Sequence, residues 1–204
     1  MKVLNNVQIP RMIKNIALAA PLMFVTPALR AQQANNEKDV FIKSQEICAA
    51  IEGKDSMEYS PEVKLGDDFI FPSIVVDLSE KRLYHYDYDG YLKDVYPIAS
   101  GKKLTPTKPG LKIIADIEEY PYKNAYGTRR KRYPADYGTH LLRLKNVDNK
   151  TGEIIGEDGQ YIHGTSKPNS IGKKVSKGCV RVYNTVIDTL ANQLSKDQYV
   201  LIRE

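Results

Sequence analysis

Residues 161–184 read YIHGTSKPNSIGKKVSKGCVRVYN and contain one histidine, His163, sixteen residues before one cysteine, Cys179. A thiol attacks carbonyl groups as its thiolate, so a reactive cysteine needs a neighbouring base or cation that lowers its pKa. Gly178 would free the backbone beside the thiol, so that the N–H groups of residues 178 and 179 could point at a developing oxyanion. The pattern favours a thiol that an imidazole ionises near neutral pH, while structural roles for both residues stay open.

Two motifs in this stretch resemble a known signature: HGT at residues 163–165 and SKGCVR at residues 176–181. They are similar to the signature of L,D-transpeptidases of the YkuD type, which are peptidoglycan-modifying cysteine enzymes. Residues 98–113 (IASGKKLTPTKPGLKI) and 186–204 (VIDTLANQLSKDQYVLIRE) also resemble segments of that family. The resemblance covers roughly residues 73–204 and implies a YkuD-like antiparallel β sandwich.

The resemblance also assigns roles to individual residues. It implies Cys179 as the nucleophile and His163 as the general base. The main-chain carbonyl of Gly164 would orient the imidazole, in place of the carboxylate of a standard triad. The amides of Gly178 and Cys179 would bind the oxyanion. Positions that would support the two turns or contact the substrate are Arg181, Ser176 and Thr165.

The resemblance implies a reaction on peptidoglycan tetrapeptide stems, which serve as donor and acceptor. Cys179 would attack the carbonyl of the third stem residue and release terminal D-Ala, and the amine of a second stem would resolve the thioester as a 3→3 crosslink. A lysine of an envelope protein is another possible acceptor, and water would make the protein an L,D-carboxypeptidase or a crosslink-trimming hydrolase. A further alternative is a non-catalytic envelope binding protein in which a disulfide joins Cys48 and Cys179.

No cofactor, metal or nucleic-acid partner is expected. The three histidines and the cysteine of the later region show no C-x-x-C or H-x-x-x-H spacing, and His85 and His140 lie in alternating patterns typical of surface or packing positions. The formal net charge is +5, but residues 1–31 contain four basic and no acidic residues. The remainder therefore has 26 basic and 25 acidic residues, which does not indicate a polyanion partner.

Residues 1–31 have the layout of a secretory signal peptide. A cationic start ends at Lys14, and the apolar stretch from Ile16 to Val25 is too short to span a bilayer. This layout predicts export to the periplasm or cell envelope, with no stable membrane insertion after cleavage. Residues 32–68 are expected to form an N-terminal helix and a linker, and residues 69–204 to form the catalytic domain.

The hydrophobic pattern beyond the linker predicts a mainly β fold with one or two small helices. Runs of β-branched and aromatic residues predict strands at residues 69–77, 110–116, 138–144, 159–164 and 198–203. Residues 81–100 predict a hairpin, because Asp89-Gly90 is a strong turn signal between two such runs.

Helical spacing and turn-rich composition predict the other segments. Apolar residues from Asp39 to Ile51 recur at helical spacing, and Asn184 is expected to cap a helix with an apolar face. Residues 118–136 are rich in Tyr, Lys and Arg and are expected to form a long loop. Residues 117–159 could then form a lid over the site.

Overall fold

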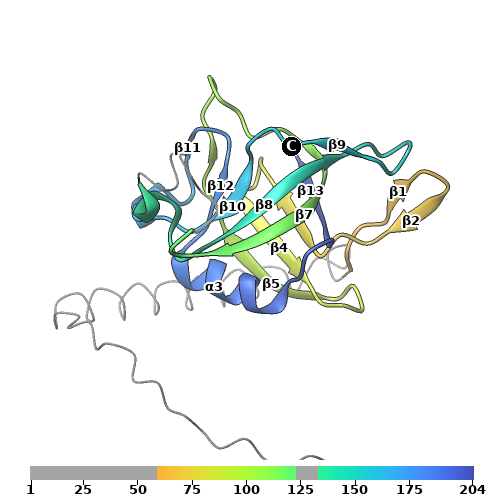
Figure 1. Cartoon of the computed structure of the whole chain (residues 1–204), viewed down its shortest axis with the longest axis horizontal. Helices are drawn as coiled ribbons and strands as arrows, with labels where there is room; N and C mark the ends of the chain where they lie inside the picture. Colours follow the sequence, from red (N-terminus) through yellow and green to blue (C-terminus); the bar gives the residue numbers. More distant parts are fainter. Residues whose placement is uncertain (1–58, 123–132) are drawn as a thin grey trace, which may run out of the picture.

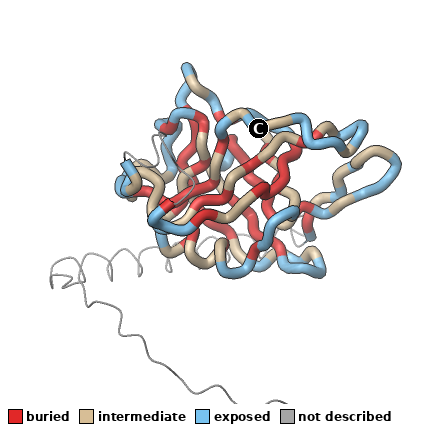
Figure 2. Tube along the Cα trace, viewed as in Figure 1, coloured by how far each residue is buried: buried red, intermediate tan, exposed pale blue. Residues whose placement is uncertain are grey.

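A nine-stranded sheet dominates the computed structural model, which describes residues 59–122 and 133–204 (Figure 1). Its strands are β3 (Ile74–Asp77), β4 (Arg82–Tyr86), β5 (Leu92–Pro97), β7 (Gly110–Glu119), β8 (His140–Val147), β9 (Ile154–Gly156), β10 (Tyr161–His163), β12 (Val180–Arg181) and β13 (Tyr199–Arg203). The order across the sheet is β12-β10-β8-β7-β13-β3-β4-β5, and β9 pairs with β8. The sheet curls, so that buried residues gather on its inner side (Figure 2).

Shorter elements complete the described part of the chain. Two small sheets are formed by β1 (Val63–Leu65) with β2 (Asp68–Ile70) and by β6 (Ser100–Gly101) with β11 (Lys174–Ser176). The helical elements are the 3-10 turns η1 (Pro134–Tyr137) and η2 (Pro168–Ser170) and the helix α3 (Asn184–Gln193). Within the described ranges, no helix has the length and apolar character that crossing a membrane requires.

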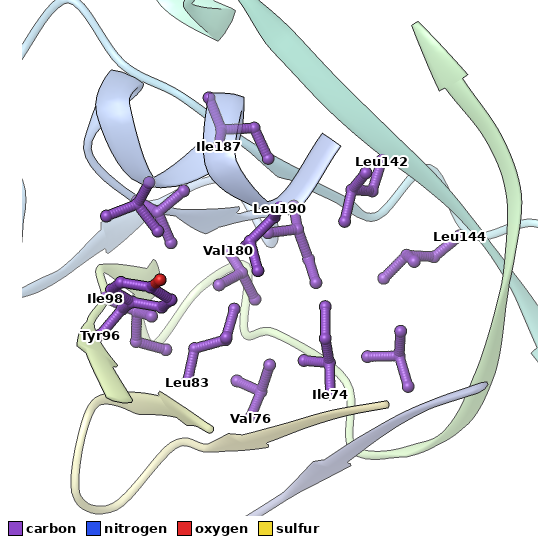
Figure 3. Close-up of a cluster of buried hydrophobic side chains, with 14 of the residues drawn as sticks. Ile74, Val76, Leu83, Tyr96, Ile98, Leu142, Leu144, Val180, Ile187 and Leu190 are labelled. Carbon is purple, nitrogen blue, oxygen red and sulfur yellow. The ribbon is translucent and has the colours of Figure 1, made fainter. Parts of the chain in front are cut away.

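The main core lies between the curled sheet and α3 (Figure 3). The helix contributes Val186, Ile187 and Leu190, which are its buried residues. They pack in one cluster with Leu142 of β8 and Val180 of β12, both of which are also buried. Burying a side chain of this size contributes about 1.5–3 kcal/mol, so this cluster firmly joins α3 to the strands that form the site.

The predicted mainly β fold is confirmed, and most strand pairs are antiparallel. Three pairs in the described residues are parallel: β10 with β12, β13 with β3, and β11 with β6. The predicted hairpin is also confirmed as β4–β5. Its turn is closed by Asp87, whose Oδ1 accepts hydrogen bonds from the N–H groups of Asp89 and Tyr91, and Gly90 has a φ of +84°.

The prediction for residues 118–136 is partly wrong. Strand β7 extends to Glu119 because Ile117, Glu118 and Glu119 pair with β8, and η1 lies at the other end of the segment. Residues 140–147 form a sheet strand with buried leucines, so this part of the predicted lid belongs to the core. The predicted signal peptide, the helix over Asp39–Ile51 and Cys48 lie outside the described residues.

Candidate active site

Two neighbouring parallel strands bring the cysteine and the histidine to the same face of the sheet. Ile162 pairs with Val180, and both side chains are buried in the core. Because successive side chains of a strand point to opposite faces, the residues that flank this pair point away from the core. His163, Cys179 and Arg181 accordingly line one hollow of about 240 Å³, together with Thr165 and Ser176.

His163 is buried and held in a defined orientation. Its Nδ1 forms a hydrogen bond with the carbonyl oxygen of Gly164, and a carbonyl can only accept, so Nδ1 carries the proton. The ring packs on Tyr137, with 4.8 Å between ring centroids. Burial lowers the pKa of His163 to about 4, with the Gly164 carbonyl opposing this and the charge of Arg181 adding to it. The imidazole is therefore neutral near pH 7, with a lone pair on Nε2.

Asn184 fixes the turn that contains His163. Its Oδ1 accepts a hydrogen bond of 2.8 Å from the N–H of Thr165. Gly164 fits against this side chain without a Cβ, which would lie 3.1 Å from the Cα of Gly138 and would overlap Asn184 Oδ1. The prediction that Asn184 caps α3 is wrong: Tyr183 occupies the cap position without a side-chain bond. The amide is directed at the histidine turn instead.

Ser176 holds the turn that contains Cys179. The Oγ of this buried serine donates to the carbonyl oxygen of Cys179 at 2.6 Å and accepts from the N–H of Gly178 at 3.1 Å. Gly178 has a φ of +114°, a conformation that favours glycine. Its N–H already has a partner, as a buried donor requires, so the geometry does not support the predicted oxyanion role for this amide.

The thiol of Cys179 differs from the sequence-based expectation in its ionisation. Burial raises its pKa above the ordinary value, Asp158 adds to the increase, and the backbone of Tyr161 and the charge of Arg181 oppose it. The Sγ lies 3.8 Å from the carbonyl oxygen of Gly159, an acceptor that favours the protonated thiol. The prediction of a thiolate near neutral pH is therefore wrong, because burial outweighs the nearby positive charge.

The walls of the hollow are predominantly cationic. Lys102, Lys167, Lys177 and Arg181 line it, whereas Asp136 is the one acidic residue in its lining among the described residues. Sequence reasoning identified Arg181 but missed Lys102 and Tyr137. Both residues lie far from the cysteine in sequence, so only the folded chain places them at the site.

The remaining histidines lie away from this hollow. His85 is buried beside Asp94, with 3.7 Å between Nδ1 and Oδ2. His140 Nδ1 lies 2.7 Å from Asp188 Oδ1 on α3. In the two described ranges no group of His, Cys, Asp and Glu is arranged to hold a metal ion, and Cys179 is a free thiol.

The curled sheet and this hollow define a mainly β domain with a candidate thiol active site. A family model described as the YkuD L,D-transpeptidase catalytic domain matches residues 72–202, and the chain belongs to this family. The family assignment rests on most of the described chain and agrees with the resemblance noted in the sequence.

Proteins from two bacteria illustrate the similarity. The chain is 30% identical over 141 residues to YkuD of Bacillus licheniformis, covering 64% of this chain and 71% of that protein. It is 32% identical over 133 residues to YcfS of Escherichia coli, covering 60% of this chain and 41% of that protein. Both relatives carry names of the L,D-transpeptidase class. The chain thus spans less than half of the Escherichia coli relative.

A solved structure shares the fold. The crystal structure of an L,D-transpeptidase from Mycobacterium tuberculosis superposes with a TM-score of 0.50 at 18% identity. The match covers 66% of this chain and 59% of that chain. At this identity the likeness concerns the fold alone.

Proposed function

We propose that this protein is an L,D-transpeptidase that acts on peptidoglycan stem peptides through a thioester at Cys179. One observation carries the proposal: Cys179 and a buried, neutral His163 line the same hollow, because Cys179 directly precedes β12, which pairs in parallel with β10. A neutral imidazole is the protonation state that a general base needs. Membership of the YkuD family supports this reaction class.

The acylation step begins with the thiol and the neutral imidazole. As Cys179 Sγ forms a bond to the carbonyl carbon of the third stem residue, His163 Nε2 accepts the thiol proton. Raised thiol pKa and lowered imidazole pKa both favour this concerted transfer over a preformed ion pair. The N–H of Cys179 is the oxyanion donor, since the Gly178 amide is already bonded to Ser176.

The tetrahedral intermediate then collapses, and its C–N bond breaks. The imidazolium of His163 gives its proton to the departing amine, and D-Ala leaves. An amine from a second stem attacks the thioester, His163 accepts a proton from it, and the thiol is restored. The product is a 3→3 crosslink. A lysine of an envelope protein or water reacts through the same acyl-enzyme, which gives protein attachment or L,D-carboxypeptidase activity.

The proposal includes a place for the protein in the cell. Residues 1–31 act as a signal peptide and residues 69–204 form the catalytic domain. The predicted linker is wrong at its end, because β1 (Val63–Leu65) lies in it and pairs with β2 (Asp68–Ile70). The substrate class requires a site outside the cytoplasmic membrane, in the periplasm or cell envelope. The cationic start and the short apolar stretch of the leader support this location.

Intact-mass spectrometry of the protein with a tetrapeptide stem tests the proposal. We expect an adduct with the mass of the acyl tripeptide, release of D-Ala, and no adduct in Cys179→Ala. A carbapenem should also acylate the wild-type thiol. Crosslinked dimers among the products indicate transfer, and free tripeptides indicate hydrolysis. A reduced wild-type protein that forms no adduct with either reagent contradicts the proposal.

A further inference from the structure

A second hollow adjoins the first, and Arg181 lines both. It has a volume of about 740 Å³ and is lined by η2 and by the start of β11. Three residues line both hollows, namely Lys167, Val175 and Arg181. A ligand that reaches Cys179 can therefore extend past Arg181 into a space large enough for further groups of a peptide.

The second hollow has cationic donors and no acidic lining residue within the described chain. Lys167, Lys173 and Arg181 supply three positive charges. Two donors in its walls also lack a hydrogen-bond partner: Arg181 Nε and Ser170 Oγ are both buried and unpaired. Buried polar groups are nearly always satisfied, so these two atoms leave hydrogen-bonding capacity beside the hollow.

We propose that this second hollow binds a free carboxylate of the peptide that reacts at Cys179. This inference rests on the proposed function. A carboxylate offers two acceptor oxygens to the planar donors of a guanidinium, and Arg181 is in place to use them. Lys167 and Lys173 add charge, and Ser170 adds a hydroxyl donor. The carboxylate belongs either to the terminal residue of the stem or to a side chain near the reacting carbonyl.

Titration of Cys179→Ala with three synthetic tetrapeptides distinguishes these two sources. One peptide keeps all its carboxylates, one is amidated at the terminus, and one is amidated on the side chain. Without the thiol the peptides bind but do not react. Amidation of the bound carboxylate should weaken binding about tenfold, because a charge-assisted bond is replaced by a neutral one. Amidation of the other carboxylate should have little effect.

Lys173 and Lys174 provide a matched pair of variants, because they are adjacent and exposed, and only Lys173 lines the second hollow. In the same background, Lys173→Gln should reduce the preference for the acid over the amide by about threefold, which is typical of one partly exposed charge pair. Lys174→Gln should leave the preference unchanged. The preference should also fall as salt is added.

Three results are decisive. Equal binding of the acid and both amides, or equal effects of Lys173→Gln and Lys174→Gln, overturns the carboxylate site while leaving the proposed function intact. A preference of the expected form, without acylation of the wild-type protein by the same peptide, supports the carboxylate site and contradicts the transpeptidase. Absence of binding by all three peptides overturns both.

Discussion

The pKa values of His163 and Cys179 are shifted in opposite directions, and burial is the main cause of each shift. Burial lowers the pKa of His163 to about 4 and raises the pKa of Cys179. Each shift stabilises the neutral form, so the resting site holds a thiol and an imidazole rather than an ion pair. The base is available at neutral pH only if its ring keeps its orientation, which depends on the turn formed by Gly164 and Thr165.

We predict that Asn184 is a positioning residue for this turn. Asn184→Ala leaves the N–H of Thr165 without its acceptor, so the Gly164 carbonyl that holds His163 loses its fixed place. The acylation rate should fall about tenfold with little change in KM, consistent with the 1–3 kcal/mol effect of an unsatisfied buried donor. Stopped-flow measurement of acylation by a carbapenem checks this.

A conservative variant and a control separate positioning from general destabilisation. Asn184→Asp keeps the acceptor, so the rate should recover. Its negative charge should raise the pKa of His163, so that acid abolishes acylation at a higher pH. Thr189→Ala removes a 3.0 Å bond to the Thr185 carbonyl within the same helix, away from the turn. It should leave the pH profile unchanged. Equal profiles for all three variants would refute the positioning role.

Sequence reasoning singled out Cys179 and His163 as the candidate pair but not the residues that surround them. The motifs identify His163 and Cys179, but only the folded chain shows the parallel pairing of β10 with β12 that brings both residues to one hollow. Asn184 was assigned to a helix cap because its position before an apolar face fits that role equally well. The ionisation state of the Cys179 thiol could not be predicted, because the spacing of residues does not give the degree of burial.

The pair formed by β6 and β11 connects the cysteine turn to the segment that follows β6. Thr105 Oγ1 donates to the carbonyl oxygen of Ser176 at 3.3 Å, and the N–H of Lys102 donates to the same oxygen at 3.1 Å. Gly101 allows this close packing: an added Cβ would lie 2.7 Å from the carbonyl carbon of Pro106 and would overlap neighbouring backbone atoms. Backbone cannot rotate away as a side chain can.

We therefore predict that Gly101→Ala separates β6 from the turn that follows it and disturbs Ser176. The free energy of unfolding should fall by about 1–3 kcal/mol, as for other overpacked sites. Acylation of Cys179 should slow more than this loss of stability explains. Gly110→Ala is the control: its Cβ would meet open space, although its φ of +129° imposes strain. Urea unfolding and acylation rates for the two variants test the difference, and identical losses would contradict it.

Elements of ordinary length were predictable, and very short ones were not. Strands β4 and β5 and helix α3 have enough residues for periodicity and turn signals to identify them. Strands β6 and β12 have two residues each, too few for any pattern. Their pairing depends on partners distant in sequence, such as Ala99 with Arg181.

In chain order, the first and last strands of the nine-stranded sheet are neighbours, so the stability of the whole domain depends on long-range pairs. Strand β13 lies parallel to β3, and Arg203 Nε donates to Asp77 Oδ2 at 3.0 Å. Burial is the largest single influence on the pKa of Asp77 and raises it. Hydrogen bonds from Glu80 N–H and Ser79 and the charge of Arg203 nevertheless together lower the pKa below its ordinary value. The stabilisation from Asp77 is therefore lost only as the pH falls below its ordinary value of 3.8.

His163 controls stability in a higher pH window. Its pKa falls from 6.5 in the unfolded chain to about 4 in the folded protein, so between these values the unfolded state binds more protons. Stability is complete above pH 6.5 and declines as the pH falls toward 4, by about 3 kcal/mol in total. Urea unfolding at pH 7.5 and pH 4.5 should show this decline in the wild type and in His140→Gln, which keeps the buried imidazole. In His163→Gln the free energy of unfolding should decline less between these pH values, by most of the about 3 kcal/mol expected for the wild type. This difference does not depend on how far the substitution itself lowers stability at pH 7.5. An equal decline in the wild type and His163→Gln would mean that the imidazole is not held neutral by burial.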